Sequence, residues 1–203
     1  IITDVVEDQT DWQFENTGMC PSITEQQLNE HRMKHRPLIG GVSIGIDTQE
    51  HRTKVATMGL IVRDSLDGQL VGLTNNHVVS PDLFTTANML VNTMYNYKDV
   101  QVMQPARAEA ASAGYPMYEE NVVGDVKRVY PIYEPVANRN NLIDAAIFNI
   151  TDDGYTSMVD GSSGSLLGLN GEPVTIATTS EIDNLDSGVS LFKSSRTTGA
   201  FGS

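Results

Sequence analysis

The chain has 203 residues, 39% of them apolar, and its 13 basic and 26 acidic residues give a net charge of −13 at pH 7. So acidic a chain repels phosphate backbones, which argues against nucleic acid as a partner. The sequence contains no apolar run of about 18 residues, so we expect no membrane span. The apolar content is sufficient for one large or two small domains. The 17 glycines, 8 prolines and many short β-branched runs favour an all-β fold over a helical one.

Residues 1–37 are expected to form an N-terminal extension with one short helix. Ser22 to Glu25 has the spacing of a capping box, which predicts the start of this helix, and Arg36-Pro37 ends it. His31 and His35 are four residues apart, which is a spacing of metal ligands on a helix, but the sequence suggests no third ligand. We therefore expect both histidines on a solvated helix face and not as ligands of a metal.

Cys20 is the only cysteine, so the chain cannot form an internal disulfide. Disulfides are common in small secreted domains, and their absence here favours an intracellular or virion setting, while the compartment is otherwise unknown. The residue lies in an irregular stretch away from any apolar strand. We therefore do not expect it to be a nucleophile.

The first strong pattern is that of a β-hairpin. The apolar runs Thr57–Val62 and Gly68–Leu73 flank the polar stretch Arg63–Asp67, which predicts two strands joined by a turn. The second strand leads into His77, and a histidine at the end of an apolar strand is a candidate general base. His51 lies in a separate polar turn and is expected to be exposed.

A long excursion follows at 80–121, with a short helix predicted around Ala106–Gly114 over a cleft. Asp144 then lies inside the apolar run Asn141–Ile147, where an unpaired charge would be costly to bury. We therefore expect Asp144 to have a buried partner. His77 meets this need, because a carboxylate that accepts the ring N–H fixes the tautomer and stabilises the imidazolium formed when the other nitrogen takes a proton.

Five phrases of the sequence, in the same order, resemble the trypsin-like serine peptidases with the chymotrypsin fold, in their bacterial, phage and plant branch. The phrases are Arg36–Gly45, Met58–Val79 with its NNHV segment, Gln104-Pro105 followed by Val123–Arg128, the DAAI segment Asp144–Ile147, and Val189–Gly199, which is similar to a K-x-GRTTG strand with Ser195 in place of a glycine. The resemblance implies two six-stranded β-barrels. The first would span 38–150 and carry His77 and Asp144, and 151–203 would be the start of a second barrel, incomplete in this chain.

In that family a histidine takes the proton of a serine nucleophile and an aspartate orients the histidine, so the resemblance gives these roles to His77 and Asp144. It implies a serine endopeptidase that hydrolyses a peptide or protein substrate through an acyl-enzyme, without a cofactor. In the family the serine follows the K-x-GRTTG strand. It is therefore expected beyond Ser203, or on a companion segment C-terminal to this chain.

Ser163 is an alternative nucleophile, because Gly161–Leu167 looks like the serine segment of the family. It follows Asp144 by only 19 residues, too few for the strands that normally precede the serine, so a surface loop is the preferred interpretation. A different class of function is also open. The chain could be a catalytically inactive or self-processed protease-like module that serves structure or binding in a virion or larger assembly.

Overall fold

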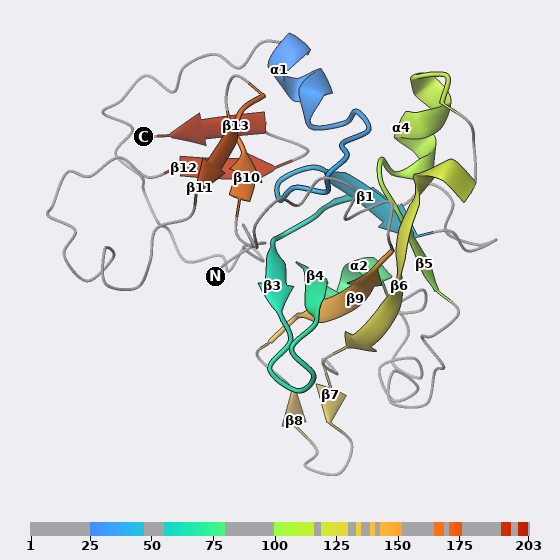
Figure 1. The fold of residues 1–203 in the computed structure, drawn as a ribbon, viewed down its shortest axis with the longest axis vertical. Helices are drawn as coiled ribbons and strands as arrows, with labels where there is room; N and C mark the ends of the chain where they lie inside the picture. The colour runs from blue at the N-terminus through green and yellow to red at the C-terminus, as the bar shows by residue number, and fades with distance from the viewer. Residues whose placement is uncertain are drawn as a thin grey trace, which may run out of the picture.

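The structure is a computed structural model that describes residues 25–46, 55–79, 100–115, 119–129, 133–134, 139–140, 143–151, 165–168, 171–175, 192–195 and 199–202. In these ranges the chain is mostly β, with few and short helices (Figure 1). The predictions made for Cys20, His51 and Ser163 concern residues outside them.

The largest element is a seven-stranded antiparallel sheet (Figure 1). Its strands, in the order in which they are hydrogen-bonded, are β2 (Ala56–Thr57), β1 (Ser43–Ile46), β5 (Gln101–Met103), β6 (Val122–Val129), β9 (Ala146–Ile150), β4 (Leu70–Thr74) and β3 (Ile61–Arg63). Central strands with alternating apolar residues turn one face inward, and in β9 every second residue is buried.

The two outermost strands of this sheet, β2 and β3, belong to one continuous stretch of chain, 56–63. Between them, the N–H of Met58 donates to the carbonyl of Val42 (2.8 Å), beside β1. The N–H of Gly59 donates to the carbonyl of Leu73 in β4 (2.9 Å). The sheet is therefore curled and barrel-like, because the same stretch contacts strands at both of its ends.

The core fills the inside of this curl. Phe148 is the largest fully buried side chain, and its ring lies over Gly72, with which it is paired across β4 and β9. Branched aliphatic side chains from other strands belong to the same cluster, among them Ile44, Ile46, Val102 and Val126. Burial of these side chains is the main stabilising contribution to the sheet.

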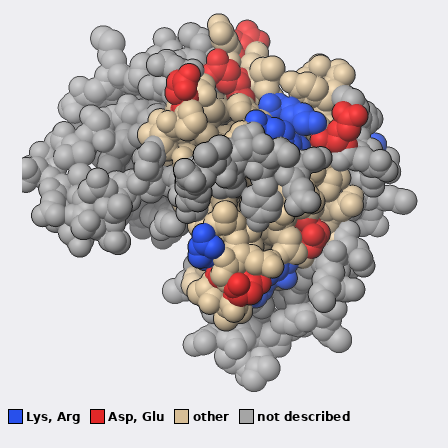
Figure 2. Space-filling model, viewed as in Figure 1, with Lys and Arg blue, Asp and Glu red and all other residues tan. Residues whose placement is uncertain are grey.

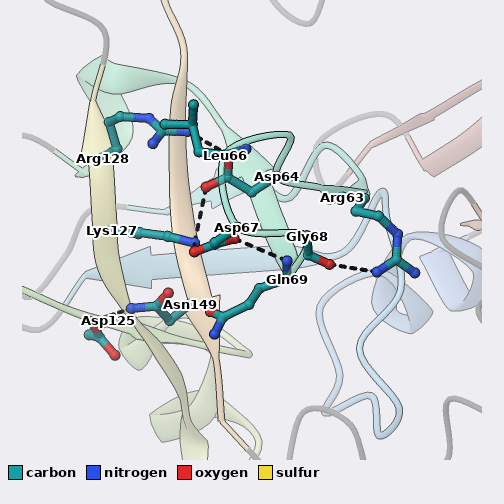
Figure 3. A network of polar contacts seen from close by, with 10 residues as sticks. All are labelled: Arg63, Asp64, Leu66, Asp67, Gly68, Gln69, Asp125, Lys127, Arg128 and Asn149. Atoms are coloured by element: carbon teal, nitrogen blue, oxygen red, sulfur yellow. Dashed lines mark hydrogen bonds and ion pairs between the residues drawn. The ribbon is translucent and has the colours of Figure 1, made fainter.

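The predicted hairpin that leads to His77 is confirmed, since β3 and β4 pair directly. Its turn is bound by a polar network to strand β6, on the far side of β9 (Figure 3). The buried carboxylate of Asp64 contacts Arg128 Nη2 (2.9 Å) and Lys127 Nζ (3.0 Å). Hydrogen bonds from the N–H of Leu66, from Lys127 and from Arg128 lower the pKa of Asp64 to about 2.

The predicted N-terminal helix is present as α1 (Glu25–Glu30), but it ends before both histidines. The expectation of a solvated helix face is wrong for His31, which is 1% exposed. Its Nδ1 is hydrogen-bonded to the carbonyl of Gly41 (3.0 Å), and its own carbonyl accepts from Ser43 N–H (2.7 Å). The chain turns inward after α1 and packs on the sheet, which buries the ring. His35 is half-buried, with Nε2 at 2.7 Å from the carbonyl of Glu30.

The short helix expected within the excursion is confirmed as α4 (Arg107–Ser112). Two further short helical segments are α2 (Asn76–Val79) and the 3-10 turn η2 (Glu119–Asn121). A small hairpin of β7 (Tyr133–Glu134) and β8 (Arg139–Asn140) precedes β9.

The described part of 151–203 forms two two-stranded sheets, β10 (Ser165–Leu167) with β11 (Pro173–Thr175) and β12 (Phe192–Ser195) with β13 (Gly199–Gly202). The first of these sheets adjoins the main sheet at Gly40, whose N–H donates to the carbonyl of Ser165 (3.1 Å) and whose carbonyl accepts from Leu167 (2.9 Å). Helix α1 lies beside β13 (Figure 1).

Candidate functional site

His77 lies just after the inner strand of the hairpin. Strand β4 ends at Thr74, and α2 begins two residues later with its first turn closed by a hydrogen bond from Val78 N–H to the carbonyl of Asn75 (3.2 Å). Val78 and Val79 are buried in the core, at 7% and 0% exposure, and hold this short helix in place. His77 is thereby fixed at the rim, with 38% of its side chain exposed.

Asp144 lies just before β9, the strand that pairs with β4. The register of the two strands ends with Thr74 opposite Ala146, so the residues just beyond this pair are brought side by side. The expectation of a buried pair is wrong, because 35% of the Asp144 side chain and 38% of the His77 side chain are exposed. The apolar run that suggested burial begins to pack only at Ala146, and Ile143 on the other side is 52% exposed.

The contact predicted between His77 and Asp144 is present. Ring atom Nδ1 of His77 is hydrogen-bonded to Oδ2 of Asp144, and the backbone N–H of His77 donates to Oδ1 (3.1 Å). One residue thus occupies both oxygens of the carboxylate. Because the carboxylate only accepts, the hydrogen lies on Nδ1, and Nε2 is the nitrogen that can take a proton from a reacting group.

The surroundings of Asp144 favour its ionised form. Partial burial raises the pKa of the carboxyl, but this is outweighed by hydrogen bonds from the ring and backbone of His77, by the charge of that ring and by a hydrogen bond from the backbone of Asn76. The pKa of Asp144 therefore lies below its ordinary value. An anion held in this way can stabilise positive charge on the imidazole.

Two residues of the site, Asn75 and Asn76, were not identified from the sequence. The side-chain Nδ2 of Asn75 donates to the backbone carbonyl of Asp144 (3.1 Å), and Asn76 contributes its backbone N–H to the carboxylate. Both are buried, at 8% and 0% exposure. Their position at the start of α2 is the feature that could have identified them, because asparagine side chains near the beginning of a helix commonly hydrogen-bond to nearby backbone groups.

The surroundings of the site give few further indications. No group of three or more potential metal ligands occurs among the described residues, and none of the described helices is long and apolar enough to cross a membrane. On the face shown in Figure 2, acidic and basic side chains of the described residues lie close to one another.

No protein-family model matches the chain, and no curated protein matches its sequence.

Proposed function

We propose that the protein is a trypsin-like serine endopeptidase in which His77 is the general base and Asp144 orients it. The observation that carries this proposal is the double contact of the Asp144 carboxylate with the ring and backbone of His77. An ion pair made only for stability does not need to fix a tautomer or to leave the ring partly exposed. A general base needs both properties.

The main sheet supports the same proposal. If 56–63 is counted as one strand, six strands follow one another around the curl, as in the first barrel of the trypsin-like fold. The proposed histidine follows one strand and the proposed aspartate precedes its neighbour, at one rim of the curl. In this proposal β10 to β13 belong to the second barrel.

The reaction is acyl transfer. His77 Nε2 takes the proton of a serine hydroxyl as its oxygen attacks the carbonyl carbon of the scissile peptide bond. The imidazolium then gives this proton to the leaving amine, the C–N bond breaks, and an acyl-enzyme remains. Water, activated by the same nitrogen, hydrolyses the ester and restores the serine. Asp144 stabilises the imidazolium in both halves, and backbone N–H groups beside the serine would hold the oxyanion.

The serine is proposed to lie outside the described residues. It is either Ser163 or a residue C-terminal to Ser203, including one on a companion segment. The arrangement of the family favours the second source. Labelling of one serine, located by mass spectrometry, decides between them.

A fluorophosphonate probe tests the proposal on the protein expressed from its whole reading frame. We expect one serine to be labelled, His77→Ala to abolish labelling, and Asp144→Asn to slow it on the order of 10⁴-fold, because the wrong tautomer is then held. Asp125→Asn is the matched control, since Asp125 in β6 accepts a hydrogen bond from Asn149 in β9 (2.9 Å), on the strand that follows Asp144. This variant should label at the parental rate.

Two results would contradict the peptidase. One is a folded protein that is not labelled at all, which would support the inactive structural or binding module. The other is a labelling rate that His77→Ala leaves unchanged. Ser163→Ala adds the assignment of the nucleophile: a folded variant that is no longer labelled would identify Ser163 as the nucleophile.

A further inference from the structure

We propose that Asn75 is a positioning residue that holds the main chain of Asp144 in register with His77. The proposal rests on the function above for its catalytic consequence, and on geometry alone for its structural part. It differs from the roles of His77 and Asp144 because Asn75 does not touch the reacting atoms.

The geometry begins where the ladder between β4 and β9 ends. The last paired residues are Thr74 and Ala146, so ladder hydrogen bonds do not hold the residues beyond them. Asn75 is the next residue after Thr74, and its Nδ2 donates to the carbonyl of Asp144 at 3.1 Å. The side chain of Asn75 therefore continues the connection between the two strands by one further hydrogen bond.

Asn75 is also connected to the helix that carries His77. Its carbonyl accepts the N–H of Val78, which closes the first turn of α2. One residue thus fixes the start of the histidine segment with its backbone and the aspartate segment with its side chain. It is 8% exposed, so water competes little for either contact.

The two ends of Asp144 are then held from the same three-residue segment. His77 and Asn76 hold the carboxylate, and Asn75 holds the carbonyl. If the carbonyl were released, the carboxylate could swing away from the ring without breaking the strand. A misplacement of about 1 Å in a catalytic group can cost on the order of 10²-fold in rate.

The test replaces Asn75 by leucine, which has nearly the same shape and cannot donate. The first measurement is the proton NMR signal of His77 Nδ1–H in the full-length protein with ¹⁵N-labelled histidine. A proton held between imidazole and carboxylate resonates far downfield, and the signal needs no activity. We expect it in the parent and expect it to broaden or move upfield in Asn75→Leu.

The matched control is Asn149→Leu. Asn149 also donates from a part-buried amide, to Asp125, but away from the rim. It should lose stability to a comparable degree while the His77 signal stays in place. If Asn75→Leu does not fold, Asn75→Ser replaces it, because serine is well accepted before a helix but is too short to reach the carbonyl.

The second measurement is the rate of fluorophosphonate labelling, which we expect Asn75→Leu to lower about 10-fold to 100-fold. An unchanged His77 signal in the folded variant would overturn the proposal, even if the parent is labelled. An altered signal in a protein that is never labelled would support the positioning role and contradict the peptidase. The two proposals therefore fail separately.

Discussion

Ser194 packs so closely against Gly41 that a β-carbon at position 41 would overlap its hydroxyl. Ser194 Oγ in turn donates to the carbonyl of Leu167 (2.7 Å), and the N–H of Gly41 donates to the carbonyl of Met58 (2.8 Å). Gly41 also has a φ of +84°, in the left-handed region. This glycine is therefore a point of close approach between the main sheet and the later strands.

We expect Gly41→Ala to lower the free energy of unfolding by roughly 2–4 kcal/mol, from backbone strain and overlap together. Gly68→Ala is the matched control, because Gly68 has a φ of +75° and open space around it. It should cost only about 1–2 kcal/mol. Urea denaturation measures both, and equal losses in the two variants would contradict the close contact with Ser194.

Gly72 is a glycine whose neighbour is an aromatic side chain. A β-carbon there would overlap the ring of Phe148, which lies on the paired residue of β9. We expect Gly72→Ala to destabilise the protein by about 1–3 kcal/mol, because the ring would have to leave its place in the core. Phe148→Leu should cost less in the Gly72→Ala background than in the parent, and equal costs in a double-mutant cycle would contradict the overlap.

Asp64 predicts an acid-dependent component of stability. Its pKa is lowered from 3.8 to about 2 in the folded protein, so the unfolded chain binds more protons between these values. The stabilisation is therefore complete above about pH 4 and is lost as the pH falls towards about 2. We expect the free energy of unfolding of Asp64→Asn to fall less steeply than that of the parent in this window. Parallel pH profiles would contradict the network with Lys127 and Arg128.

Gln104 fastens the segment after α1 to the sheet. Its buried side chain accepts from His35 N–H (2.9 Å) and from Arg36 Nη1 (2.7 Å), and donates to the carbonyl of Met33 (2.7 Å). We expect Gln104→Leu to lower the free energy of unfolding by about 1–3 kcal/mol for each buried polar group that loses its hydrogen bond to Gln104 and finds no other. The control is Gln101→Leu, an exposed position at the start of β5, the strand that Gln104 follows, which should change stability by less than about 0.5 kcal/mol. Equal effects on thermal unfolding would contradict this role.

The sequence was most informative where a pattern is local. Apolar runs on either side of a polar turn predicted the hairpin that carries His77, and the alanine-containing run 106–114 predicted the helix α4. The contact of His77 with Asp144 followed from the chemical needs of the two side chains. Peptidase activity stays a prediction, because it depends on a serine that the described residues do not include.

The predictions that were wrong or missing concern burial and contacts that depend on segments distant in the sequence. His31 is buried where it is hydrogen-bonded to Gly41 and Ser43, at the start of β1, and a periodic pattern around residue 31 cannot report such a contact. Asp144 is half-exposed because the strand after it, and not the residue itself, enters the core. The role of Asn75 depends on where the β4–β9 ladder stops, and strand ends are poorly defined by sequence.

The stretch 56–63 determines how the whole sheet opens in local unfolding. A flat sheet can fray by shedding its outermost strand while the remainder persists. Here, release of this one stretch would take a neighbour from β1 and from β4 in the same event. Local opening of the curled sheet should then be cooperative. The amide hydrogens of Met58, Gly59 and Leu73 should exchange with deuterium at a common rate.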